Sequence, residues 1–153
     1  MTDLLLTNAH VLDVESGDYA ETDLRIADGE VVETGTGLRA EVETVDVDGG
    51  FVLPGLIDCH VHVVAATADL GELRTWPRSY LAHRTAQNMA AMLDRGFTTV
   101  RDVGGADHGI ARAQAEGLLR GPRVHFAGKP LSQTGYKVPL VRTLVRRALA
   151  KLA

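Results

Sequence analysis

The stretch VLPGLIDCHVHV, residues 52–63, places His60 and His62 at the end of an apolar run that begins at a Pro-Gly turn. A short apolar run bounded by turn residues indicates a buried strand. Residues i and i+2 of a strand share a face, so the two Cβ atoms lie about 6–7 Å apart. Both rings can then reach one ion at bond lengths of about 2.0–2.1 Å. The alternative is a pair of structural or surface histidines.

Strands and helices alternate after this stretch. Apolar periodicity predicts a helix at 78–96, stopped by Gly96, a strand at 97–105, a helix at 107–121 and a strand at 122–128. Such alternation implies parallel strands joined by right-handed crossovers. The histidines would lie at the carboxyl edge of the sheet, where α/β and barrel enzymes build their sites.

Residues 1–53 have a different pattern, with short β-type segments separated by turn residues. Asp28-Gly29 lies between two such segments and is a strong hairpin signal. This region is predicted to be a small antiparallel β unit. Residues 138–153 place Arg142, Arg146, Arg147 and Lys151 opposite an apolar stripe, which predicts a basic amphipathic helical tail that packs on its own protein.

Composition excludes several classes of protein. The 153 residues are 45% hydrophobic and 24% charged, which is typical of a globular domain. The net charge of −4 does not favour nucleic-acid binding, and no run is long enough for a membrane span. The single cysteine, Cys59, cannot form an internal disulfide, so we expect a cytoplasmic protein. Strand alternation directs Cys59 away from the histidines, as a small buried residue.

Taken together, these segments resemble the amidohydrolase superfamily, in particular its imidazolonepropionase-like and metal-dependent prolidase-like members. The matching motifs are LLLTNAHVLD, DLRIADGEVVETG, VDVDGGFVLPGLIDCHVHV, GFTTVRDVGGADHG and GPRVHFAGKPLSQTG. The resemblance implies a partial composite β-sandwich at 1–53, followed at 54–137 by the first about three βα units of a (β/α)8 barrel. It makes His60 and His62 ligands of a divalent metal, zinc, which activates water to hydrolyse an amide, dipeptide or cyclic amide.

The resemblance covers only the N-terminal portion of the family pattern and stops near Gly135. Family members complete the metal site with a lysine, further histidines and an aspartate from later strands. A whole barrel needs about 250 residues, which is more than the 153 residues of this chain. We therefore expect weak or no activity from this chain alone. One alternative is a non-catalytic fragment that mediates self-association or protein interaction, and another is a second chain that completes the fold.

Three further residues are candidates for the site. Arg101 and Asp102 end a predicted strand beside Gly104-Gly105, where they would contact a small-molecule substrate or form a local ion pair or loop-ordering hydrogen bond. Asp58, two residues before His60, would be a partner of a histidine or a turn-facing carboxylate. No catalytic acid or base can be assigned from the sequence.

Overall fold

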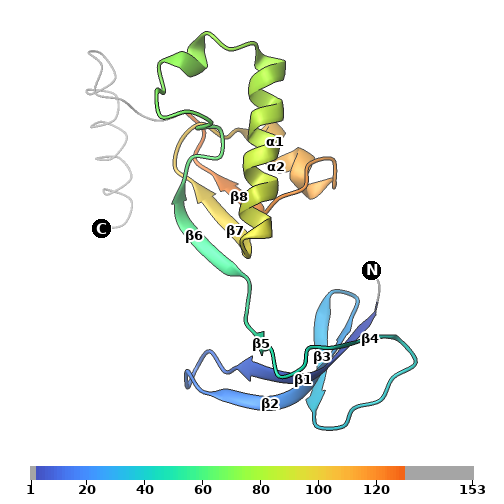
Figure 1. Ribbon diagram of the computed structural model, residues 1–153. Helices are drawn as coiled ribbons and strands as arrows, with labels where there is room; N and C mark the ends of the chain where they lie inside the picture. The colour runs from blue at the N-terminus through green and yellow to red at the C-terminus, as the bar shows by residue number, and fades with distance from the viewer. Residues whose placement is uncertain (1–2, 130–153) are drawn as a thin grey trace, which may run out of the picture. The chain divides into compact units, whose positions relative to one another are not determined.

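The computed structural model describes residues 3–129, so the predicted tail at 138–153 lies outside the described residues. The chain divides into two compact units, one ending at Pro54 and one beginning at Gly55 (Figure 1). Within the described part, no helix has the length and apolar character needed to cross a lipid bilayer. The predicted fold class, a β-rich N-terminal part followed by the start of a series of βα units, is confirmed.

The first unit is a five-stranded sheet in the order β3-β2-β1-β4, with β5 also paired to β1. Its strands are β1 (Leu4–Leu12), β2 (Tyr19–Ala27), β3 (Glu30–Gly35), β4 (Glu43–Asp46) and β5 (Phe51–Val52). The predicted hairpin joins β2 to β3, and Asp28 and Gly29 both have positive φ, as a type I′ turn requires.

The prediction of a wholly antiparallel β unit is wrong, because the sheet also contains parallel pairs. β4 and β5 both run parallel to β1. After β3 the chain passes through residues 36–42 to the far edge of β1, instead of turning back beside β3. A prediction based on short turns misses this pairing, because a parallel neighbour is reached through a longer connection.

The second unit is a three-stranded parallel sheet in the order β6-β7-β8. Its elements are β6 (Leu56–Val61), a 3-10 turn η1 (Glu72–Arg74), α1 (Arg78–Asp94), β7 (Phe97–Asp102), α2 (His108–Ala115) and β8 (Arg123–Phe126). The predicted order of strands and helices is confirmed, and α1 ends just before Gly96. Figure 1 shows α1 beside the sheet, where it packs on β7 while α2 packs on β8.

One apolar cluster holds the helices to the sheet. Its buried members are Val61, Val63, Met89, Val100, Ala106 and Val124. Val61 and Val63, on either side of His62, belong to this cluster, whereas His60 and His62 are both exposed. The two imidazoles therefore lie outside the core.

Cys59 is exposed, contrary to the expectation that it is a small buried residue. The start of β6, which lies at the edge of the sheet, is poorly covered, since Leu56 is 48% and Ile57 67% exposed. Strand alternation gives the face of a residue, but tertiary packing decides whether that face is covered.

An ion pair joins the end of α1 to the segment before β8, where Arg120 Nη2 lies 2.6 Å from Asp94 Oδ1. The hydrogen bond that Arg120 donates holds the pKa of the Asp94 carboxyl below its ordinary value. A carboxyl with a depressed pKa stabilises the fold above its ordinary pKa, and this contribution disappears as the pH falls through the depressed value. The loss of this stabilisation is therefore confined to acid, below about pH 4.

We predict that Arg120→Gln returns the pKa of Asp94 toward its ordinary value, because the charged donor is lost. A carboxyl-detected NMR titration of wild type and variant measures this shift. Arg112→Gln is the matched control, since Arg112 pairs with Glu116 on the exposed surface of α2 and the segment that follows it. If Asp94 titrates alike in Arg120→Gln and wild type, the hydrogen bond does not persist in solution.

Candidate metal centre

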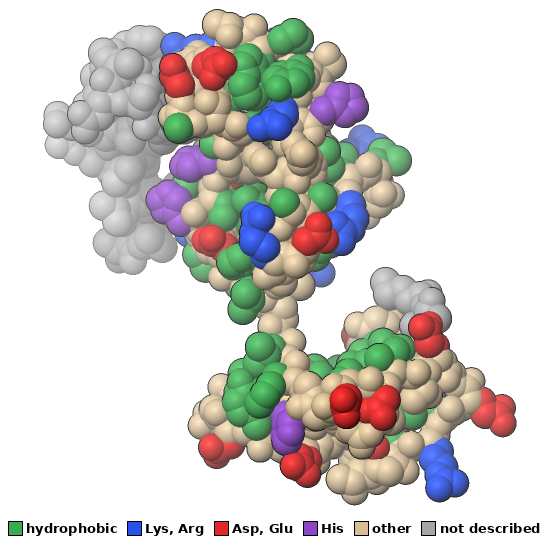
Figure 2. All heavy atoms as spheres, viewed as in Figure 1, with side chains coloured by type: hydrophobic (Ala, Val, Ile, Leu, Met, Phe, Trp, Pro, Cys, Tyr) green, Lys and Arg blue, Asp and Glu red, His purple; other side chains and the backbone are tan. Residues whose placement is uncertain are grey.

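His60 and His62 lie at the carboxyl end of β6, and both are exposed. The centroids of their rings are 5.7 Å apart, and the ring planes are inclined at 77°. Figure 2 shows two neighbouring histidine side chains at the surface of the unit that begins at Gly55. The predicted juxtaposition is therefore present, although the role of the two residues as metal ligands stays a prediction.

A main-chain carbonyl determines the state of the His62 ring. Nδ1 of His62 lies 2.7 Å from the carbonyl oxygen of Gly104. A carbonyl only accepts hydrogen bonds, so Nδ1 carries the proton and donates, and the lone pair is on Nε2. Metal-bound histidines commonly show this arrangement, with the second ring nitrogen donating to a carbonyl or carboxylate. The contact with Gly104 thus leaves Nε2 of the neutral His62 ring without the proton, and metal binding through this atom stays a prediction.

Asp58 contacts the main chain of His60, two residues along the strand. Its Oδ1 accepts a hydrogen bond from the backbone N–H of His60 at 2.9 Å. The carboxylate is half-buried and satisfies one backbone N–H near the end of β6. This bond supports the strand at the candidate site, and a contact of Asp58 with a histidine ring stays untested.

Asp102 is 0% exposed, so its carboxylate has no accessible surface. Oδ2 accepts from the N–H of Val63 at 2.8 Å. Oδ1 accepts from the N–H of Gly104 at 2.9 Å and of Ala106 at 3.1 Å. Of the three roles that the sequence left open, this placement favours the loop-ordering hydrogen bond over a local ion pair and over contact with substrate.

Arg101 is exposed and lies beside Asp102 on β7. Val61 pairs with Asp102 across β6 and β7, so alternation places Arg101 on the same side of the sheet as His60 and His62. Its register partner on β8 is His125, which is also exposed and shares that side. Arg101 is therefore placed where it could meet an anionic substrate, which stays a prediction.

Gly104 belongs to the site although no side chain marks it in the sequence. Its carbonyl, not a side chain, contacts His62 across 42 residues of sequence. The signal available was the pair Gly104-Gly105 directly after a strand, which marks a loop whose backbone approaches other groups closely. Residue types alone do not reveal such a main-chain contact.

The residues present fit part of a metal site. A catalytic zinc commonly has three protein ligands and an open position. Within residues 3–129, no group of three or more His, Cys, Asp or Glu side chains is placed to hold a metal ion. His60 and His62 thus supply two nitrogen donors of suitable type, and at least one further ligand would have to come from elsewhere.

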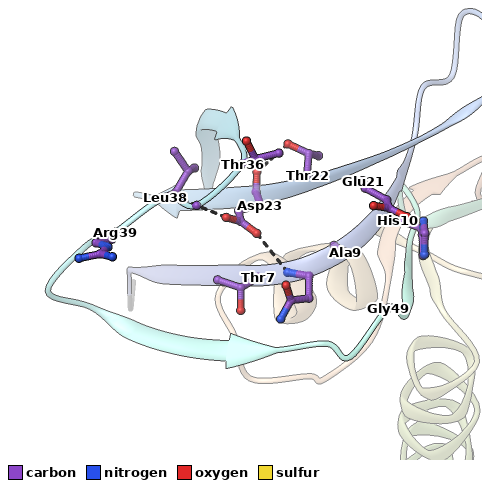
Figure 3. Close-up of a pocket in the computed structure, with 12 residues that line it drawn as sticks. Thr7, Ala9, His10, Glu21, Thr22, Asp23, Thr36, Leu38, Arg39 and Gly49 are labelled. Carbon is purple, nitrogen blue, oxygen red and sulfur yellow. Dashed lines mark hydrogen bonds between the residues drawn. The ribbon is translucent and has the colours of Figure 1, made fainter.

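A separate pocket of about 540 Å³ lies in the first unit and is lined in part by Asp23, His10 and Arg39 (Figure 3). The carboxylate of Asp23 is buried and accepts from the N–H of Asn8 at 3.1 Å and of Leu38 at 2.9 Å. Figure 3 shows both bonds, which join β2 to β1 and to the loop after β3. None of the predicted site residues lines this pocket.

The sequence of the chain is similar to that of known enzymes. Residues 51–153 match the model of the amidohydrolase family. An adenine deaminase of Oceanobacillus iheyensis is 43% identical over 61 residues, which is 40% of this chain and 10% of that protein. A dihydroorotase of Anoxybacillus flavithermus is 45% identical over 51 residues, which is 32% of this chain and 12% of that protein.

The fold is also similar to solved structures. A prolidase in complex with N-methylphosphonate-L-proline superimposes with a TM-score of 0.80 at 42% identity, covering 86% of this chain and 33% of that one. A Xaa-Pro dipeptidase superimposes with a TM-score of 0.74 at 26% identity, covering 90% and 36%. The matched region is thus about a tenth of the length of the curated relatives and a third of the prolidase.

Proposed function

Because the chain belongs to the amidohydrolase family, we propose that it forms the N-terminal portion of a metal-dependent hydrolase of C–N bonds, with His60 and His62 as two ligands of a divalent ion, zinc. The observation that carries this proposal is the hydrogen bond from His62 Nδ1 to Gly104. It leaves Nε2 available on the face of the sheet that also carries the His60 ring.

The chain's own residues have defined parts in this proposal. A divalent ion, when bound, acts as a Lewis acid that activates water and polarises the carbonyl to be cleaved. His60 and His62 would hold the ion from the end of β6, next to Val61 and Val63 of the buried cluster. Arg101, on the same side of the sheet, would bind an anionic group of the substrate.

We propose a dipeptide or a related amide as the substrate, with hydrolysis in the cytoplasm. The prolidase is 42% identical over 86% of this chain, whereas phenylurea hydrolase B and N-isopropylammelide isopropylaminohydrolase, which cover 96% and 99%, are 20% and 22% identical. The identity to the prolidase therefore favours a peptide-type C–N bond. The carboxylate of such a substrate would be complementary in charge to Arg101.

Metal analysis tests the proposal. We predict that the purified chain, after equilibration with zinc, retains the ion in a fixed ratio. His60→Ala and His62→Ala should each abolish this binding, because each variant leaves only one imidazole nitrogen to hold the ion. Plasma mass spectrometry and competition with a chromogenic chelator measure stoichiometry and affinity. His125→Ala is the matched control, since it removes an exposed imidazole from β8 on the same side of the sheet.

Zinc that persists in the His60→Ala, His62→Ala double variant would contradict the proposal, as would a chain that never binds zinc. A metal-free chain that self-associates would favour the alternative, a non-catalytic interaction module. The exposed apolar side chains of Leu56 and Ile57 at the edge strand β6 are the observation behind that alternative. An unpaired strand edge of this kind readily pairs with another chain.

A further inference from the structure

We propose that Asp102 is a positioning residue that orients His62 and selects its tautomer through the main chain of Gly104. This inference rests on the proposed function, in which His62 is a metal ligand. It assigns Asp102 a role at the metal site without contact with the metal or the substrate.

Both oxygens of the Asp102 carboxylate accept hydrogen bonds from the main chain. Three backbone N–H groups, those of Val63, Gly104 and Ala106, donate to its two oxygens. The side chain is fully buried, so no water replaces these bonds. An ionised carboxylate accepts at both oxygens, whereas an asparagine amide would turn its NH2 group toward at least one of the three donors.

The second step is that the partners of Asp102 hold His62 from two directions. Val63 is the next residue after His62, so the bond at 2.8 Å fixes the main chain that carries the imidazole. Gly104 donates its N–H to Asp102 and accepts the Nδ1 proton of His62 at its carbonyl. The carboxylate thus fixes both the base of the His62 side chain and the group that contacts its ring.

The third step is the rigidity of the loop after β7. Val103 donates to the carbonyl of Val61 at 3.1 Å, and Gly105 donates to the carbonyl of Gly128 at 2.9 Å. The loop is therefore tied to β6 on one side and to the segment after β8 on the other, and Gly104 lies between these two ties. Movement of the Gly104 carbonyl away from His62 would require several of these bonds to break.

Asp58 does not have this arrangement. Its hydrogen bond reaches the backbone of His60 and no group that contacts a ring, and its side chain is half-buried. The residue expected from the sequence to support a histidine is thus Asp58, but the structure connects Asp102 to one. The difference lies in the pairing of β6 with β7, which brings Gly104 to His62.

The test compares Asp102→Asn with Asp23→Asn. Asp23 is a matched control, because it is also a buried carboxylate that accepts from backbone N–H groups, but in the first unit. Nitrogen-15 NMR of the metal-free chain at about pH 8, where an ordinary imidazole is neutral, reports which nitrogen of His62 is protonated. Wild type and Asp23→Asn are expected to show the Nδ1–H form, and Asp102→Asn a mixture of tautomers.

Zinc affinity is the second readout, and we expect Asp102→Asn to weaken it about 10- to 100-fold while Asp23→Asn leaves it unchanged. Failure of the wild type to bind zinc would remove the proposed function, yet the NMR comparison would still decide the role of Asp102. An Nε2–H form in wild type, or an unchanged tautomer in a folded Asp102→Asn, would overturn the inference. If Asp102→Asn does not fold, Asp102→Glu replaces it, since a carboxylate displaced by one methylene cannot accept from the same three N–H groups and should give the same mixture of tautomers.

Discussion

Met89→Ala is expected to lower the free energy of unfolding of the second unit by about 2–5 kcal/mol, the range measured for such truncations in well-packed cores. Met89 is fully buried on α1 and belongs to the cluster that joins this helix to the sheet. Its Cβ and Cε lie close to Gly121, just before β8, so truncation leaves a cavity at a tight contact. The surrounding backbone can close such a cavity only in part.

Urea unfolding monitored by tryptophan fluorescence measures the effect, because the one tryptophan of the chain, Trp76, lies in the second unit. Leu118→Ala is the control: this leucine is 79% exposed, so its loss should change the free energy of unfolding by less than about 0.5 kcal/mol. Equal effects of the two substitutions would show that the cluster around Met89 does not hold α1 to the sheet.

Gly105→Ala is expected to destabilise the second unit by at least about 2 kcal/mol, for two physical reasons. Gly105 has φ of +124°, a conformation that an alanine rarely adopts. In addition, an added Cβ would overlap Cγ2 of Val64, which follows the candidate ligand strand. Because Gly104 precedes it, the substitution should also displace the carbonyl that contacts His62.

Two further variants separate these causes. Gly117→Ala tests conformation alone, since Gly117 has φ of +74° but open space around its Cα, and should cost about 1–2 kcal/mol. In a Val64→Ala background the overlap is removed, so Gly105→Ala should become less costly. A double-mutant cycle from thermal or urea unfolding gives this coupling. No coupling between positions 64 and 105 would mean that the loop avoids the overlap by moving.

Much of the second unit could be predicted from local patterns. The helix α1 follows from apolar spacing and ends before Gly96, and β7 and β8 follow from apolar runs between glycines. The Asp28-Gly29 hairpin is equally local, because two residues with positive φ suffice to form it. In each case the signal lies within the element, so long-range pairing could not alter it.

Long-range pairing decided the features that the sequence analysis missed. The parallel partners of β1 depend on which edge the chain reaches after β3. The exposure of Cys59 depends on what covers the start of β6. The partner of the His62 ring is a carbonyl, and every residue has one, so no residue type marks it.

By itself, the sequence determined that His60 and His62 share one face at the end of a strand, because alternation is a local property of extended backbone. Only the tertiary structure decided which nitrogen of His62 is left with a lone pair, since that depends on a carbonyl in the loop after the neighbouring strand β7. It also decided that Asp102 is directed into the interior, where three amides surround its carboxylate. Strand alternation is a property of the local sequence, whereas hydrogen bonds between residues distant in sequence form only once the strands have paired.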